Sequence, residues 1–189
     1  MDASDPEGDQ EIAQDTALSL TAQSRYFPEM PPSPPGIAFL GNRALWSRPK
    51  LAFFCSAKCP GAILLRVLKW VPTLAGRNDV VLASGFHTPV ECEVLRLALR
   101  QQTPVIICPA RGLPKVLPPE WRPPLDEGRL LVTTPFPATA TRITAASAEE
   151  RNRWLAEHAE QILVAWATPG GRLESSLRDI PSAKKLPLV

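Results

Sequence analysis

The residues with the clearest capacity for chemistry are a group of cationic and amide side chains and a glycine turn. The run Arg151-Asn152-Arg153 lies in a segment with helical character, and the turn Thr168-Pro169-Gly170-Gly171 follows a strand-like apolar segment, residues 162–166. In an α/β sheet, a turn at the carboxyl end of a strand lies where ligands bind. Its N–H groups and the start of the next helix favour an anion. The sequence therefore predicts a site for a nucleotide or nucleic-acid phosphate.

Two earlier turns carry polar residues that could help to hold a phosphate. Ser56 and Lys58 follow the first expected strand, and Ser84-Gly85 follows the second. An ordinary polar connector explains Ser56 and Lys58 equally well. A solvated helix face, with arginines paired to nearby glutamates, is likewise an alternative for Arg151 and Asn152. The first turn lacks the GxGxxG dinucleotide fingerprint, and we expect no cofactor.

The histidines and cysteines do not form a motif that predicts catalysis or metal binding. His87 lies in the second turn. A catalytic histidine needs a nucleophile and an orienting partner, and no spacing in the sequence indicates either. The four cysteines lack the close paired spacing of a zinc site; they are Cys55, Cys59, Cys92 and Cys108. We therefore expect no metal and mostly buried, reduced thiols.

Composition bounds the class of protein. The chain has 189 residues, is 44% hydrophobic and carries a net charge of only +2. A net charge of +2 does not by itself indicate nucleic-acid binding, so any binding of nucleic acid would depend on a local basic patch. The acidic N-terminus does not resemble a signal peptide, and the sequence contains no apolar run long enough to span a bilayer. We expect a cytoplasmic protein that does not contact the membrane.

Strands and helices are expected to alternate from Gly36 onward. The expected strands are residues 51–55, 80–83, 105–108, 129–133 and 162–166. The expected helices are residues 61–74, 89–100, 147–160 and 171–177, and capping boxes at Thr88 and Ser147 open two of them. This order predicts an α/β, Rossmann-like, doubly wound and mostly parallel sheet with helices on both faces.

Three regions are expected along the chain. Residues 1–35 form an acidic and then proline-rich N-terminal segment that is partly disordered, with a short helix over residues 10–24 and an extended connector over residues 28–35. Residues 36–180 form the Rossmann domain, and residues 181–189 form a C-terminal tail.

Several of these segments together resemble a known family. Gly41-Asn42 and Pro49-Lys50 precede the first expected strand, Ser84-Gly85 follows the second, residues 105–113 contain the third, and Arg151-Asn152-Arg153 opens a late helix. In these features the chain resembles the DNA-processing protein family DprA, also called Smf. That family belongs to the SLOG superfamily of Rossmann-like domains.

The resemblance covers roughly residues 36–177 and implies binding of single-stranded DNA or a nucleotide without catalysis. It also implies a role in DNA recombination, a RecA-type recombinase as partner, and a homodimer. We expect nine residues to line the pocket: Ser56, Lys58, Ser84, Gly85, Arg111, Arg151, Asn152, Gly170 and Gly171.

The first two turns depart from the family pattern. Cys55-Ser56-Ala57 stands where the family has Gly-Ser-Arg, so Lys58 would have to replace a phosphate-binding arginine. His87-Thr88-Pro89-Val90-Glu91 stands where the family has Ala-Arg-Gly-Ile-Asp. The chain therefore resembles a diverged member of the family. We expect it to share the family's fold more readily than its DNA binding.

Two alternatives remain. Pro169-Gly170-Gly171 resembles the start of the Pro-Gly-Gly-x-Gly-Thr-x-x-Glu motif of the LOG phosphoribohydrolases. In that case Arg151 and Glu174 would act on a nucleoside monophosphate, because cleavage of an N-glycosidic bond needs a carboxylate beside the ribose. The other alternative is a degenerate scaffold that has kept the fold and lost its ligand.

Overall fold

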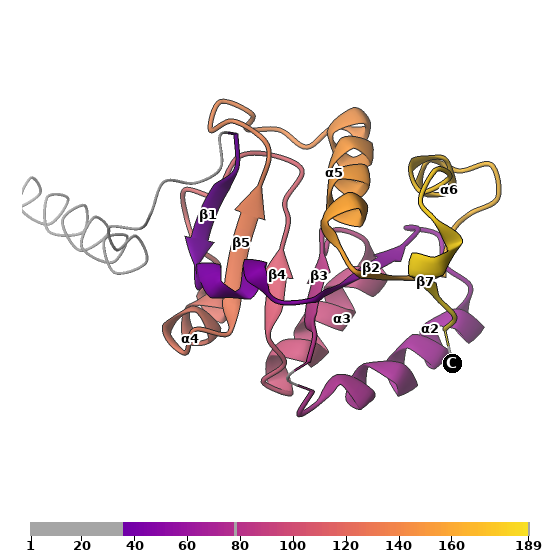
Figure 1. Ribbon diagram of the computed structural model, residues 1–189, viewed down its shortest axis with the longest axis horizontal. Coiled ribbons are helices and arrows are strands. Elements are labelled where there is room, and N and C mark those ends of the chain that lie inside the picture. Colours follow the sequence, from indigo (N-terminus) through magenta and orange to yellow (C-terminus); the bar gives the residue numbers. More distant parts are fainter. Residues whose placement is uncertain (1–35, 78, 189) are drawn as a thin grey trace, which may run out of the picture. The chain divides into compact units, whose positions relative to one another are not determined.

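Seven strands form one sheet in the part of the chain that the computed structural model describes, residues 36–77 and 79–188 (Figure 1). Their order is β1-β5-β4-β3-β2-β6-β7, with β1 antiparallel to β5 and the other pairs parallel. The predicted α/β, Rossmann-like and mostly parallel architecture is confirmed. The expected helix at 10–24 and the proline-rich connector lie outside the described residues.

The strands follow the continuous apolar runs of the sequence. Their bounds are β1 Ala38–Gly41, β2 Lys50–Cys55, β3 Val81–Ser84, β4 Val105–Ile107, β5 Leu130–Thr134, β6 Gln161–Trp166 and β7 Lys185–Leu186. All residues of β2, β3, β4 and β5 are buried, as parallel strands covered on both faces require. Neither β1 nor β7 is predicted from the sequence, because the four residues of β1 are too few to show a period and β7 lies in the expected C-terminal tail.

The chain reverses its direction across the sheet between β2 and β6. Strands β2 to β5 are added one after another on one side, and β6 then returns to pair with β2 on the other side. The carboxyl ends of β2 and β6 therefore flank the topological switch point, where α/β sheets bind their ligands.

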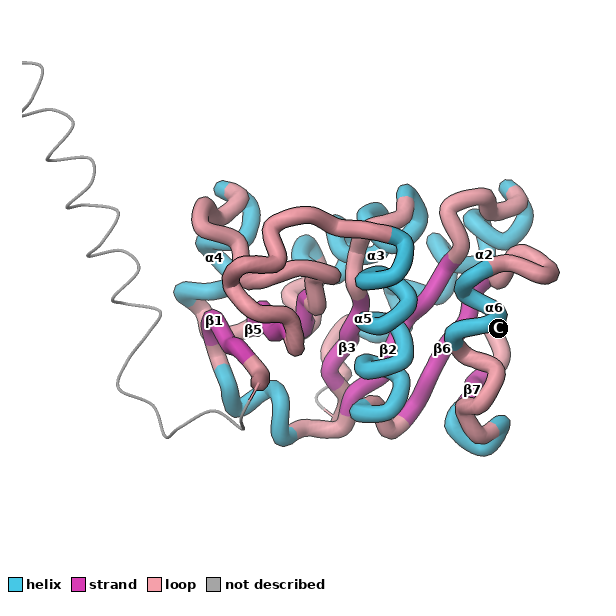
Figure 2. The backbone as a smooth tube through the Cα atoms, turned by 90° about the horizontal axis from the view of Figure 1, so that it is seen from above, coloured by secondary structure: helices cyan, strands magenta, loops and turns pink. Residues whose placement is uncertain are grey.

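Helices cover both faces of the sheet. The bounds are η1 Arg43–Ser47, α2 Gly61–Trp70, η2 Val71–Leu74, α3 Pro89–Arg100, η3 Pro119–Trp121, α4 Arg122–Asp126, α5 Ala145–His158, α6 Arg172–Ser176 and η4 Ser182–Lys184. Phe53 stacks on Trp70 of α2 with ring centroids 5.5 Å apart, whereas Phe54 shares a core cluster with Leu155 of α5. Successive strand residues face opposite sides, so α2 and α5 lie on opposite faces (Figure 2). No helix in the described ranges is long and apolar enough to cross a membrane.

The capping box predicted at Thr88 is confirmed, and the one predicted at Ser147 is wrong. Thr88 accepts from the N–H of Glu91, whose carboxylate accepts from the N–H of Thr88. Helix α5 instead begins at Ala145, because Thr144 is its N-cap and Ser147 occupies the third helical position. A serine can reach back from that position as a glutamate does, and this moves the start of the helix by one turn.

The proline-rich stretch between β4 and β5, where the sequence predicts no strand or helix, contains two short helices, η3 and α4. Pro123 and Pro124 stand at the start of α4, where a proline has no intrahelical hydrogen bond to lose. Prolines in a sequence usually indicate a loop, so η3 and α4 are not predicted.

Lys50 and Glu160 connect the start of β2 with the segment before β6. The N–H of Lys50 donates to Glu160 Oε2 at 2.5 Å, and its Nζ lies 3.4 Å from Oε1. Burial raises the pKa of Glu160, but the hydrogen bond from the Lys50 backbone and the charge of Lys50 outweigh it, so the net pKa is lowered.

We expect Glu160→Gln to lower the free energy of unfolding at pH 7 by about 1 kcal/mol, since the carboxylate is half-exposed. A carboxyl group whose pKa is lowered by folding stabilises the protein above its unfolded pKa of about 4.3, and that contribution is lost as the pH falls through the folded value. In urea unfolding, the free energy of unfolding of Glu160→Gln should therefore be lower than that of the unmodified chain at pH 7 and equal to it at pH 3. Glu157→Gln, which removes an exposed carboxylate from α5, is the control. An equal loss at both pH values would contradict the assignment.

Candidate anion-binding site

A cavity of about 320 Å³ lies at the switch point between the carboxyl ends of β2 and β6. Four segments far apart in the sequence form its wall: the turn after β2, the start of α3, the first half of α5, and the loop from β6 to α6. Five of the predicted site residues line it: Ser56, Lys58, Arg151, Asn152 and Gly171. The structure thus brings the two parts of the predicted site together. We call this hollow the switch-point cavity.

Arg151 is the buried cation of this cavity. The residue is only 4% exposed, and its Nη1 donates to the carbonyl of Cys108 at 2.8 Å while its Nε donates to Asn152 Oδ1 at 2.8 Å. Neither acceptor carries a charge, and among the described residues no carboxylate forms an ion pair with Arg151. A guanidinium has five N–H donors, and a buried cation is costly unless it is paired. Arg151 is therefore a buried cation whose two described acceptors are both neutral.

The absence of a side chain at Gly85 makes room for this guanidinium. Gly85 follows β3 directly, and a Cβ there would lie 1.2 Å from Arg151 Nη1 and 1.9 Å from Cζ. Cys108 follows β4 directly. Arg151 therefore reaches from α5 across the carboxyl ends of two adjacent strands, and Gly85 is required for close approach rather than for an unusual backbone angle.

A second, smaller cavity of about 140 Å³ adjoins the first and shares Arg151 and His87 with it. Gly85 and Arg111, both predicted site residues, line this middle cavity. Its other walls include the side chains of Trp121 and Ile143. A cation and an aromatic ring thus face one hollow, a combination that suits a phosphate beside a base.

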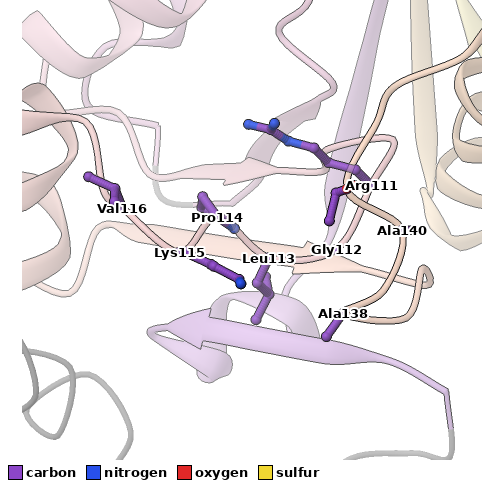
Figure 3. A pocket seen from close by; sticks show the side chains of 9 residues that line it. Arg111, Gly112, Leu113, Pro114, Lys115, Val116, Ala138 and Ala140 are labelled. Atoms are coloured by element: carbon purple, nitrogen blue, oxygen red, sulfur yellow. The ribbon is translucent and has the colours of Figure 1, made fainter.

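A third cavity of about 300 Å³ lies between the loops that follow β4 and β5 and shares Arg111 with the middle cavity (Figure 3). Leu113, Pro114 and Ala138 form part of its wall, and Lys115 adds a second cation. The two loops are held together by Gly112, whose N–H donates to the carbonyl of Ala140 at 2.8 Å. In Figure 3 the side chain of Arg111 extends away from Leu113 and Ala138.

The three cavities follow one another along the carboxyl edge of the sheet, and their lining is strongly cationic. Five of the described lining residues are basic, and we call this surface the basic edge: Lys58, Arg111, Lys115, Arg151 and Arg172. Arg172 also forms an ion pair with Glu149, with 3.4 Å between Nε and Oε1. The only carboxylate among the described lining residues is Glu91. The local patch that the sequence analysis required is present.

The charge of the domain is also larger than that of the whole chain. Residues 36–189 contain 20 of the 21 basic residues and 12 of the 19 acidic ones, a net charge of +8. The value of +2 for the full chain conceals this, because the acidic residues are concentrated before Gly36. The expectation of a weak electrostatic footprint was therefore drawn from an average over two unlike segments.

Glu91 is buried and already satisfied. Its Oε1 accepts from the N–H of Cys55 at 3.2 Å, and its Oε2 accepts from the N–H groups of His87 at 3.0 Å and Thr88 at 3.2 Å. This carboxylate joins the end of β2 to the start of α3 and occupies donors that a phosphate could otherwise use. The capping box in the sequence predicts the bond of Glu91 to Thr88 but not its bond to Cys55.

The N–H groups of the predicted glycine turn are bonded within the protein. Gly170 donates to Glu174 Oε2 at 2.7 Å, Gly171 donates to the carbonyl of Thr168 at 2.8 Å, and Thr168 donates to Ser56 Oγ at 3.0 Å. The turn therefore shapes the switch-point cavity without offering these three donors to a ligand. Side chains, among them that of Arg151, therefore supply the available donors of this cavity.

Three predicted residues do not reach the cavities as expected. Ser84 is fully buried, and its Oγ accepts from the N–H of Phe86 at 3.3 Å. Gly170 and Glu174 are exposed and bond to each other. None of the three is among the described residues that line the three cavities. The side chain of Glu174, the carboxylate of the hydrolase alternative, is therefore occupied in the turn.

Burial disfavours the thiolate form of two cysteines near the site, Cys55 and Cys108. Burial, together with the neighbouring Cys59, raises the pKa of Cys55 far above its usual value. Burial raises the pKa of Cys108 to about 12, although the charge of Arg151 opposes the shift. Cys55 and Cys108 are buried as expected, whereas Cys92 is exposed. Within residues 36–77 and 79–188, no three His, Cys, Asp or Glu side chains gather in a way that could hold a metal ion.

Solved structures share this fold. The DNA processing protein A of Streptococcus pneumoniae matches with a TM-score of 0.63 at 21% sequence identity, over 80% of this chain and 53% of that chain. The DNA processing protein A of Helicobacter pylori matches with a TM-score of 0.60 at 18% identity, over 82% of this chain and 71% of that one. The DprA-like fold that the sequence predicted is confirmed. The chain spans about half the length of the S. pneumoniae protein.

The sequence itself matches no protein-family model and no curated protein. At identities near 20%, the structural likeness defines the fold alone. What the site binds must therefore be argued from its residues.

We expect Gly85→Ala to displace the Arg151 guanidinium and leave the domain folded, because the clash falls on the end of a flexible side chain. The carbonyl of Cys108 then loses its donor, so the free energy of unfolding should fall by about 1–3 kcal/mol in urea titrations. In an Arg151→Met background the same substitution should cost much less. Gly61→Ala, which meets no atom within 4 Å, is the control. Equal costs of Gly85→Ala in both backgrounds would show that the two residues are not coupled.

Proposed function

We propose that this chain binds single-stranded DNA along the basic edge, as a DNA-processing protein, and that it does so without catalysing a reaction. One observation carries the proposal: the buried guanidinium of Arg151 has no charged partner in the described part of the chain and faces both the switch-point cavity and the middle cavity. Two oxygens of one phosphate can accept two parallel N–H bonds from such a guanidinium.

A strand of phosphates fits the surface better than a single mononucleotide. Cations occur in each of three adjoining cavities, and each cavity shares a cation with the next: Arg151 between the first two, and Arg111 between the second and third. The middle cavity is also lined by Trp121, an aromatic residue of the kind on which bases stack. The structurally similar H. pylori protein binds single-stranded DNA, which supports the same ligand class for this chain.

The phosphoribohydrolase alternative receives less support. It requires Glu174 beside the ribose, but the carboxylate of Glu174 accepts from Gly170 and lies outside the cavity that Arg151 faces. Glu91 lies inside that cavity but accepts three backbone N–H bonds. A RecA-type recombinase and a second copy of the chain as partners remain predictions from the family resemblance.

Binding to a fluorescent oligothymidylate, followed by anisotropy, tests the proposal. We expect Arg151→Met to weaken the affinity by about 10- to 150-fold, which corresponds to the ~1.5–3 kcal/mol of a hydrogen bond to a charged group. The variant should also reduce the slope of log affinity against log salt by about 0.7, the value for one contact to a single strand.

Arg153→Met is the matched control. Arg153 is exposed on the same helix, two residues away, and is not among the described residues that line the three cavities. Its substitution removes the same charge as Arg151→Met, and we expect this general effect to change the affinity less than threefold. Equal losses in the two variants would mean that binding is a diffuse surface effect, and no binding by the unmodified chain at low salt would refute the proposed function.

A further inference from the structure

His87 lies where the switch-point cavity and the middle cavity meet. Among the described lining residues, it and Arg151 are the two that line both cavities. Arg151 comes from α5 and is buried, whereas His87 lies in the turn between β3 and α3 and is exposed. An anion bound by the Arg151 guanidinium at this junction would therefore lie beside His87.

The backbone just before His87 is strained. Phe86 has a φ of 47°, which lies in the left-handed region that residues with a Cβ rarely adopt. Its N–H donates to Ser84 Oγ at 3.3 Å, and its carbonyl accepts from Cys92 Sγ at 3.1 Å, so polar contacts on both sides hold this conformation. Its side chain is buried. Strain of this kind persists only where the surrounding structure imposes it, and it is concentrated at functional sites.

The same turn fixes the backbone of His87 and leaves its imidazole available. The N–H of His87 donates to Glu91 Oε2 at 3.0 Å. Within residues 36–77 and 79–188, no hydrogen bond or ion pair holds the imidazole ring. A protonated imidazole has two N–H donors. His87 therefore combines a fixed backbone with a side chain that can donate to a ligand.

The charged groups around His87 are mostly positive. Four cations line a cavity that His87 also lines: Lys58 after β2, Arg111 after β4, Arg151 on α5 and Arg172 on α6. Glu91 of α3 is the one carboxylate among the described residues that line these two cavities, and its oxygens already accept three backbone N–H bonds. The thiols of Cys55 and Cys92 stay neutral, because burial raises the pKa of both. A phosphate bound among these groups favours a positive charge on the imidazole.

We propose that His87 is a DNA-contacting residue, that its imidazolium donates to the phosphate bound by Arg151, and that binding of single-stranded DNA is thereby coupled to the uptake of a proton from solvent. The inference rests on the proposed function, because it concerns the same cavities. Imidazole is the side chain whose charge ordinarily changes between pH 5 and pH 8. Because the phosphate stabilises the charged form, the gain in affinity is present at the acidic end of this range and is lost as the pH rises.

The test measures the affinity of the full chain for a fluorescent oligothymidylate by anisotropy, at constant low salt, at pH 8 and at about pH 5.5. We expect the rise in affinity between the two pH values to be about two- to fivefold larger in the unmodified chain than in His87→Gln, which is the contribution of one exposed ion pair. His87→Arg carries a charge at both pH values. It should bind at pH 8 about as tightly as the unmodified chain binds at the lower pH.

His158→Gln is the matched control, because the chain contains only two histidines. His158 is exposed at the end of α5, its Nδ1 lies 2.7 Å from the carbonyl oxygen of Trp154, and it is not among the described residues that line the three cavities. This variant should keep the full pH dependence of the unmodified chain.

The outcomes separate this inference from the proposed function. The inference is overturned if His87→Gln keeps the pH dependence of the unmodified chain, if His87→Gln and His158→Gln lose it equally, or if the unmodified chain binds DNA equally well at both pH values. In each of these cases DNA is still bound, and the proposed function stands. If the unmodified chain binds no DNA at either pH, the proposed function itself fails.

Discussion

One buried guanidinium joins three elements at the carboxyl edge of this sheet. Arg151 comes from α5, lies over Gly85 at the end of β3, and donates to the carbonyl of Cys108 at the end of β4. A buried cation with only neutral acceptors is costly unless an anion arrives to pair with it. Gly85 leaves room for this cation, and Asn152 accepts a hydrogen bond from it. The two cavities that Arg151 lines leave space for an anion.

Much of the fold could be predicted because its signals are local. The strands from β2 to β6 follow apolar runs, and the capping box at Thr88 fixes the start of α3. The errors have local causes too: Thr144, not Ser147, caps α5, and the prolines of α4 stand in a first helical turn where they are tolerated. Strands β1 and β7 form by pairing with distant partners, which no short stretch of sequence reveals.

The site could be predicted only in part, because burial and hydrogen bonding decide which polar groups remain available. The run around Arg151 and the turn at Gly171 do meet at one cavity. The sequence could not show that Glu174 bonds to Gly170, that Ser84 is buried, or that Glu91 reaches Cys55. The cationic lining was hidden by a net charge averaged over an acidic segment and a domain of charge +8.

The most direct test of this account is the crystal structure of the chain bound to a short oligothymidylate. We expect a phosphate oxygen within hydrogen-bonding distance of an Arg151 Nη atom, with the strand continuing past Arg111. DNA bound at another surface, with Arg151 still donating only to Cys108 and Asn152, would contradict it.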